Sequence, residues 1–271
     1  MKKILILSLS VLSTLLFSAC TDQANQPESQ AETIIGKHTI RFTEPPKRIP
    51  APHSVDAPLL GNGFTGVALS GTPESQVFYV ARNDFWRLKS ALDESFPLVL
   101  GKIELDIPQL KDASYLVEQQ LYDAVSTARF TKGDISVSYK AFVPATEDML
   151  IVDLNMEGNG AVEGSAGISF LGKEEQINKP PLERIFPDVR EHETKPNGVE
   201  YLSRAFVDSV DIPTKGAMAL RVSGSTDGKF TLEPGKTVRL VCAFSSNFKS
   251  DDCVATVIKK VEDFTPARQA E

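Results

Sequence analysis

Short runs of alternating apolar and polar residues, separated by turn residues, dominate this chain of 271 residues. A period of two places every second side chain on one face of an extended strand. The runs lie at 39–43, 64–69, 77–81, 98–107, 115–122, 126–131, 135–143, 149–156, 167–171, 199–210, 217–223 and 238–245. Roughly ten or more strands with short polar turns predict an all-β fold, a large antiparallel β-sandwich.

Two of these runs predict where the core lies. In Val77–Val80 both faces are apolar, which indicates a strand covered on both sides. In the next run Ile103, Leu105 and Ile107 alternate with polar residues and should point inward. Gly133 and Asp134 are typical of a tight turn between two later strands.

One helix is predicted near the end of the chain, in residues 250–271. Ser250 can cap it, and Asp251 and Asp252 in the first turn suit a helix N-terminus. An apolar stripe runs from Cys253 to Phe264 at helical spacing. Two interpretations stay open: a linker helix that leads to another domain, or a helix that docks on its own sandwich.

The first residues predict export. Residues 1–19 combine Lys2 and Lys3 with a short apolar run and small residues, and Cys20 follows directly. The run is shorter than the roughly 20 residues that span a membrane, so it reads as a lipoprotein signal peptide. Cys20 would carry the lipid, and residues 20–36 would form a flexible polar tether. The alternative is an ordinary cleaved signal. We expect a protein anchored by lipid to the bacterial cell envelope, at the outer membrane on its periplasmic or surface face.

The net charge of the chain limits the kinds of molecule that it can bind. Removal of residues 1–19 takes away Lys2 and Lys3, which leaves 27 basic and 36 acidic residues and a net charge of −9. Nucleic acid requires a basic surface, so it is excluded as a partner. Anionic lipid would not attract such a chain either, and the membrane would hold it through the Cys20 lipid only.

The two remaining cysteines, Cys242 and Cys253, leave two alternatives. An oxidising compartment allows a disulfide between them. Otherwise they are buried free thiols that act as small apolar side chains. No CxxC pair or cluster of histidine and cysteine occurs, so we expect no metal site.

Motifs for catalysis are missing. His192-Glu193 begins like a zinc-protease motif, but Pro196 stands where the second histidine is required. Glycoside hydrolysis needs two carboxyl groups held several ångströms apart, and adjacent acids such as Glu174 and Glu175 do not usually face each other. We therefore expect no catalytic residue and no cofactor in this chain.

Two segments are candidates for a ligand rim or an interface. Gly61-Asn62-Gly63 allows close approach of a ligand to the backbone, or it simply makes a turn before a strand. The second segment holds Asn83, Asp84, Trp86 and Arg87. A tryptophan face can stack on a sugar, and the polar groups can bind hydroxyls. The alternative is a buried tryptophan at the sandwich end, with Arg87 paired to Asp84.

Residues 173–198 form a stretch rich in proline and charge. A structureless insertion of this length is usually functional or disordered. It would either reach toward a partner domain or form a surface loop.

The turn at residues 61–63 and the segment Arg82-Asn83-Asp84-Phe85-Trp86-Arg87 resemble the start of the N-terminal β-sandwich, or super-sandwich, of the six-hairpin glycosidases, glycoside hydrolase families 95 and 65 and their relatives. The resemblance covers roughly residues 51–271. Asn83-Asp84-Phe85-Trp86 departs from the Asn-Glu-Asp-x-Leu-Trp pattern of family 95 fucosidases, so fucose specificity is not implied.

This resemblance implies a sandwich at 37–249 and a linker helix at 250–271 that leads to a catalytic α/α barrel, which carries the catalytic residues in those families. The chain would be the truncated accessory half of a glycosidase for α-linked glycans, inactive alone. The Asn/Asp/Trp segment would face the barrel. The alternative is a stand-alone surface lipoprotein that binds glycan without cleaving it.

Overall fold

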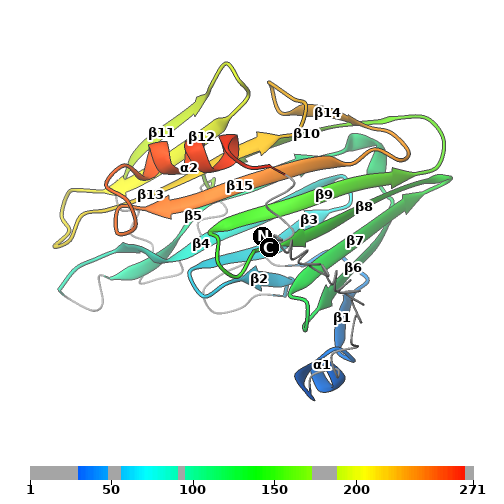
Figure 1. Ribbon diagram of the computed structural model, residues 1–271, viewed down its shortest axis with the longest axis horizontal. Coiled ribbons are helices and arrows are strands. Elements are labelled where there is room, and N and C mark those ends of the chain that lie inside the picture. The colour runs from blue at the N-terminus through cyan, green and yellow to red at the C-terminus, as the bar shows by residue number, and fades with distance from the viewer. Residues whose placement is uncertain (1–29, 48–55, 91–94, 173–187, 266–271) are drawn as a thin grey trace, which may run out of the picture.

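The chain folds into two antiparallel β-sheets packed face to face (Figure 1). The computed structural model describes residues 30–47, 56–90, 95–172 and 188–265. The nine-stranded sheet has the order β1 (Thr39–Phe42), β6 (Ser114–Gln120), β7 (Val125–Lys132), β8 (Ile135–Phe142), β9 (Met149–Glu157), β15 (Val238–Ser246), β13 (Thr214–Val222), β12 (Glu200–Phe206) and β11 (Val189–Thr194). The six-stranded sheet has the order β14 (Lys229–Leu232), β10 (Val162–Ser169), β5 (Phe96–Asp106), β4 (Ser75–Arg87), β3 (Thr65–Thr72) and β2 (Leu59–Gly61).

The predicted fold class is confirmed. One large cluster of apolar side chains fills the space between the sheets, and it includes Phe78, Phe130 and Tyr139 in edge-to-face contacts. Ile103 and Leu105 point into this core, as their alternation predicts. Stacked antiparallel sheets with alternating strands are the arrangement that such a pattern favours.

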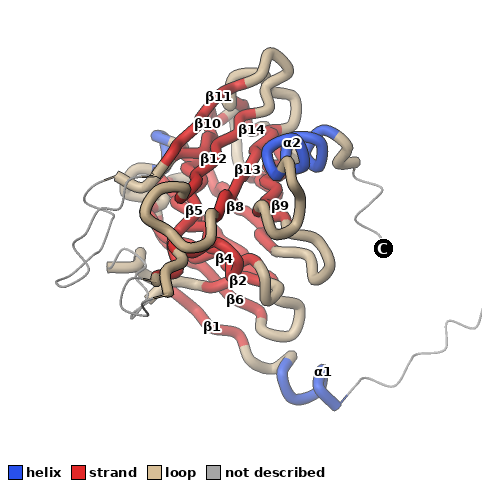
Figure 2. The backbone as a smooth tube through the Cα atoms, turned by 90° about the vertical axis from the view of Figure 1, so that its left-hand side faces the viewer, coloured by secondary structure: helices blue, strands red, loops and turns tan. Residues whose placement is uncertain are grey.

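Helix α2 (Cys253–Glu262) lies on the outer face of the nine-stranded sheet, as the turned view in Figure 2 shows. Val257 and Val261 from the helix join Val241 and Ala243 of β15 in a second, smaller apolar cluster. The helix therefore docks on its own sandwich, which is one of the two interpretations left open by the sequence.

The cap of α2 differs from the prediction. Asp252, not Ser250, is the N-cap, and its Oδ1 accepts a hydrogen bond of 2.9 Å from the amide of Ala255. Ser250 instead shares a hydrogen bond of 2.8 Å with the hydroxyl of Thr256. Because aspartate and serine are almost equally good caps, local sequence could not choose between positions two residues apart.

Several further elements lie where the sequence predicted none. Helix α1 (Gln30–Ile35) occupies part of the predicted tether and ends where the amide of Gly36 bonds the carbonyl of Glu32. Strand β11 lies in the predicted insertion at 173–198, whose residues 173–187 are outside the described ones. All six residues of β11 are exposed, so no apolar alternation marks this edge strand. The short strands β2 and β14 and a 3-10 helix at Pro108–Leu110 were also missed.

Strand β4 is longer than the predicted run at 77–81. It continues through Arg87, so the polar and aromatic segment belongs to the strand itself. The register against β5 shifts between Ala81 and Trp86. Such an irregularity re-aims side chains, and it breaks the simple alternation by which the sequence identified the strand.

Candidate functional site

One end of the sandwich gathers the candidate residues, and we call it the platform end: residues 62–64, 84–90, 121–124, 143–148, 207–213 and 247–250. The strand registers place these segments together, since Gln120 pairs with Val125, and Val125 pairs with Phe142. The two sheets also meet there, because the hydroxyl of Thr214 on β13 donates a hydrogen bond of 2.6 Å to the carbonyl of Trp86 on β4.

A buried arginine stands at the base of the platform end. The side chain of Arg82 is 0% exposed and pairs with Asp84 at 2.9 Å and with Asp148 at 3.1 Å. Asp84 shares its strand, whereas Asp148 comes from the loop before β9 on the other sheet. Two of the guanidinium nitrogens bond the two oxygens of Asp84, at 2.9 Å each. This ion triad therefore joins the two sheets and ties the loop before β9 to strand β4.

Hydrogen bonds extend the triad outward. The side-chain oxygen of Asn62 accepts from the amides of Phe64 and Thr65, and its nitrogen donates to the carbonyls of Pro144 and Glu147. Asn62 is therefore a clamp between two loops, which supports the structural interpretation of the turn at 61–63. Gly63 in this turn has a φ of +90°, which favours glycine.

The charges of the triad stabilise one another. Burial disfavours the charged form of Arg82, yet the hydrogen bonds and charges of Asp84 and Asp148 outweigh it and raise the arginine pKa. Burial likewise acts to raise the pKa of Asp84, but Arg82 and the hydroxyl of Ser246 lower it below its usual value. Asp84 is therefore held ionised, and a carboxyl held ionised cannot serve as the proton donor of a glycosidase.

Sequence reasoning singled out Asn62 and Asp84 but missed Arg82 and Asp148, which tie them together. The only local signal for Arg82 was its position directly after the apolar run 77–81 and two residues before Asp84, since residues i and i+2 of a strand share a face. Asp148 lies more than sixty residues away in the chain and offered no such signal.

Of the remaining candidates, Asn83 and Trp86 reach the surface, whereas Arg87 is buried. Asn83 is exposed and donates from its amide to the carbonyl of Gly63 at 2.8 Å. Trp86 is half-buried, and its Nε1 donates to the carbonyl of Asn83 at 2.7 Å. Arg87 is buried and donates to the carbonyl of Ser209 at 2.9 Å. The alternative of a buried tryptophan with an Arg87–Asp84 pair is wrong, because Asp84 pairs with Arg82.

Exposed large apolar side chains concentrate at this end. In the described ranges they are Ile34, Ile35, Ile40, Leu59, Phe64, Leu121, Tyr122, Val189, Val207, Ile212 and Phe248. Each belongs to the platform end, or to a strand or helix residue close to it. At the opposite end, the described turns near residues 133, 158, 197, 224 and 235 expose none. An apolar surface confined to one end marks an interaction site.

The two cysteines are free thiols, so the disulfide alternative is not realised. Cys242 points into the core between the sheets, whereas Cys253 packs under α2 on the outer face of the nine-stranded sheet. The sheet itself separates the two sulfurs. Burial raises the pKa of both thiols.

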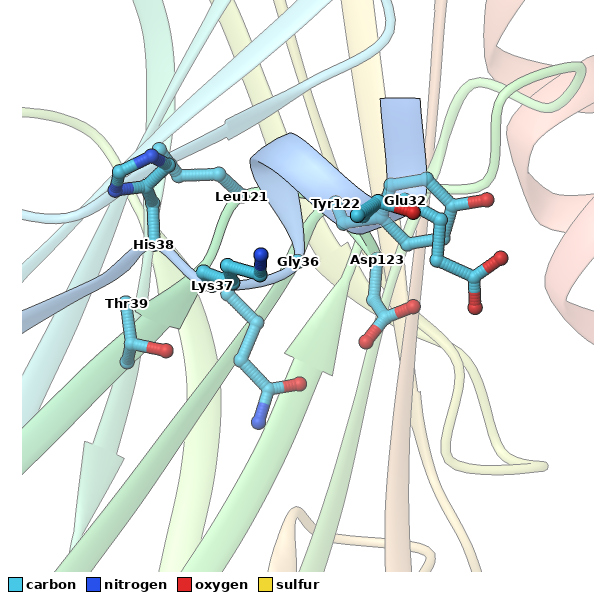
Figure 3. A pocket seen from close by; sticks show the side chains of 10 residues that line it. Glu32, Gly36, Lys37, His38, Thr39, Leu121, Tyr122 and Asp123 are labelled. Atoms are coloured by element: carbon cyan, nitrogen blue, oxygen red, sulfur yellow. The ribbon is translucent and has the colours of Figure 1, made fainter. Parts of the chain in front are cut away.

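A pocket of about 400 Å³ lies at the edge of the platform end, where α1 approaches the β6–β7 turn (Figure 3). Lys37 and His38 line it from the segment between α1 and β1, and Tyr122 and Asp123 line it from the turn. Its lining is polar, and α1 contains no buried residue.

Other kinds of site find no support in the described ranges. No group of three or more histidine, cysteine, aspartate or glutamate side chains there could hold a metal ion. No helix among those residues is long and apolar enough to cross a membrane. The predicted signal peptide at 1–19 and the lipidation residue Cys20 lie outside the described residues.

Comparison with known proteins gives matches among solved structures. No family model and no curated protein matches this chain. Among solved structures, a bacterial glucoamylase complexed with acarbose matches over 85% of this chain, at 11% sequence identity and a TM-score of 0.37. The match covers 38% of the glucoamylase chain, so this chain spans well under half the length of the enzyme it matches.

Proposed function

We propose that this chain is the N-terminal accessory domain of a lipid-anchored glycoside hydrolase that acts on α-linked glycans. Its platform end braces the catalytic α/α barrel and lines one wall of the sugar site. The lipid on Cys20 holds the protein at the bacterial cell envelope. The observation that carries the proposal is the group of exposed large apolar side chains Phe64, Val207, Ile212 and Phe248 on the platform end. Inter-domain contacts bury surfaces of this kind.

The ion pairs of Arg82 with Asp84 and Asp148 support a role in bracing the barrel rather than in catalysis. Asp84 and Asp148 are both tied to the buried guanidinium of Arg82. A retaining or inverting glycosidase needs one carboxyl group that stays protonated to donate to the leaving sugar. The triad supplies rigidity instead, and a rigid base positions the side chains above it.

Those side chains suit a sugar or a barrel loop. Trp86 leaves part of its ring exposed, and Phe64 and Phe248 are 45% and 51% exposed. Lys249 lies over the ring of Phe64 at 3.7 Å from its centroid. Aromatic faces beside the polar groups of Asn83 are the combination that recognises a sugar ring and its hydroxyls.

Two measurements test the proposal in order. The first is the DNA sequence beyond the codon for Glu271, where we expect a continuation that encodes paired helices with carboxylate-bearing loops.

The second measurement is the hydrolysis kinetics of the joined protein, this chain together with its barrel, on α-linked oligosaccharides. Trp86→Ala should raise KM about tenfold with kcat less affected, because a wall contact contributes to binding. Tyr122→Ala, an exposed aromatic at the edge, is the matched control and should leave KM unchanged. An unchanged KM for Trp86→Ala contradicts the assigned sugar wall.

A second candidate is a stand-alone surface lipoprotein that binds glycan without cleaving it. The accessibility of Trp86 and Asn83 in this chain favours it. Calorimetric titration of the chain alone with α-linked oligosaccharides separates the two. Binding that Trp86→Ala abolishes supports the stand-alone role, whereas binding that appears only in the joined protein supports the accessory role.

A further inference from the structure

Five of the exposed apolar side chains come from three neighbouring segments beside one edge of the platform end. Ile34 and Ile35 come from α1, Ile40 from β1, and Leu121 and Tyr122 from the β6–β7 turn, and we call them the edge patch. Ile40 pairs with Gln119, just before the turn. The pocket in Figure 3 shows the same neighbourhood, since residues of α1 and of the turn line it together.

Along the sequence, α1 is the described part of the chain nearest to Cys20. Nine residues lie between Cys20 and Gln30, where α1 begins, so ten Cα-to-Cα steps join them. A fully extended chain of that length spans at most about 35 Å, and a flexible one has an end-to-end distance of about 18 Å. With the lipid on Cys20, as in the proposed function on which this inference rests, the edge patch stays within a short distance of the bilayer.

We propose that the edge patch lies on the lipid surface and sets the orientation of the sandwich on the membrane. The four aliphatic side chains would enter the boundary between head groups and acyl chains, and the ring of Tyr122 would lie at the head-group level. Lys37 and Arg41 flank the patch with long stems and charged ends that can stay in water.

The charges of this neighbourhood favour a neutral lipid surface. Glu32 and Asp123 line the pocket together with Lys37 and His38, and Arg41 pairs with Glu118 at 2.6 Å. The acidic residues here are at least as many as the basic ones, so attraction to anionic lipid is not what holds the patch. The lipid anchor supplies the attachment, and the apolar side chains select which side of the domain faces the bilayer.

The test uses the fact that Trp86 is the only tryptophan of the chain. Full-length lipidated protein would be reconstituted on phosphatidylcholine vesicles that contain brominated acyl chains, which quench nearby tryptophan. In a Trp86→Phe background, Tyr122→Trp should be quenched by more than half. Adding Ile34→Ser, Ile35→Ser and Leu121→Ser should remove most of that quenching while the protein stays bound through its lipid. Native Trp86 should lose less than about a tenth of its emission.

The outcomes separate this inference from the proposed function. A bound Tyr122→Trp protein without quenching overturns the edge patch alone. Quenching of native Trp86 would mean that the whole platform end faces lipid, which contradicts the membrane contact confined to the edge and also the sugar wall. A wild-type chain that does not bind the vesicles overturns both. The emission maximum of the introduced tryptophan would also be measured without vesicles. A blue shift that grows with protein concentration would show that a second copy of the chain covers the patch instead of lipid.

Discussion

Arg82 is the residue on which the platform end depends. Its guanidinium has no exposed surface, and its two carboxylate partners are only 15% and 16% exposed. Placing one cation between two anions from different sheets satisfies each charge inside the protein. A lysine could not do the same, because a single ammonium lacks the planar fork that bonds both oxygens of Asp84.

Arg82→Met should therefore lower the free energy of unfolding by about 3–5 kcal/mol, since it leaves two half-buried carboxylates without their cation. Urea denaturation at neutral pH measures this change. Arg129→Met is the matched control, because Arg129 pairs with Glu157 at the surface, where both side chains are largely exposed. That pair should contribute less than about 1 kcal/mol. Similar losses in the two variants would refute the special role of Arg82.

Asp84 should make stability depend on pH on the acid side. Its pKa is lower in the folded chain than in the unfolded one, where it is about 3.9. The folded state thus binds fewer protons, and the stabilisation is present above about pH 4 and lost as pH falls through the folded pKa. The gap in urea midpoint between wild type and Asp84→Asn should be widest near pH 6 and narrow below pH 4. A gap that stays constant from pH 6 to pH 3 argues against ionised Asp84 as the cause. Asp251→Asn, at an exposed position, serves as control.

Among the elements, α2 is held by both its face and its ends. Its apolar stripe packs on β13 and β15, and Arg221 donates from its side chain to the carbonyl of Glu262 at 3.2 Å. Asn197 adds a hydrogen bond of 2.6 Å to the side chain of Glu262. The helix is therefore part of the folded domain, and its stability should report on its cap.

Asp252→Ala should destabilise the chain by about 1 kcal/mol, because the amide of Ala255 loses its acceptor. Asp251→Ala, one position earlier and exposed, should change stability by less than about 0.5 kcal/mol. Thermal and urea unfolding of the two variants give the comparison. The opposite ranking would contradict the assignment of the N-cap to Asp252.

Strands with one buried face were predictable, because alternation in Ile103, Leu105 and Ile107 reports directly on burial. Strand β11 was not predictable, because every residue of this edge strand is exposed and its sequence therefore shows no alternation of apolar and polar residues. The pairing of Arg82 with Asp148 could not be predicted from the sequence for a different reason. It depends on which loop of one sheet meets which strand of the other, and that is set by the packing of the whole sandwich.

The whole molecule has two unlike ends. Tight turns with glycines at positive φ close one end, for example at Gly133, Gly224 and Gly235. The platform end carries the exposed apolar residues, and the ion triad lies beneath it. Sequence composition could place these residues in loops, but only the strand registers show that the loops share one end.

This asymmetry predicts how the isolated chain behaves in solution. With its platform end uncovered, the chain should self-associate as concentration rises, since contiguous apolar surface is driven out of water. Val207→Ser, Ile212→Ser and Phe248→Ser together should shift the onset of association, measured by light scattering, to at least about threefold higher concentration. Because these side chains are exposed, the free energy of unfolding should change by less than about 0.5 kcal/mol per site.

Changes at the opposite end supply the control for this prediction. Thr226→Ser and Thr237→Ser remove exposed methyl groups from two of its turns and should leave association unchanged. The joined protein gives the decisive comparison, because a barrel seated on the platform end would cover the same three side chains. Serine there should then weaken the contact between domains, which limited proteolysis detects as faster cleavage between them. If serine at these positions affects neither association nor proteolysis, the apolar side chains of the platform end do not form an interface.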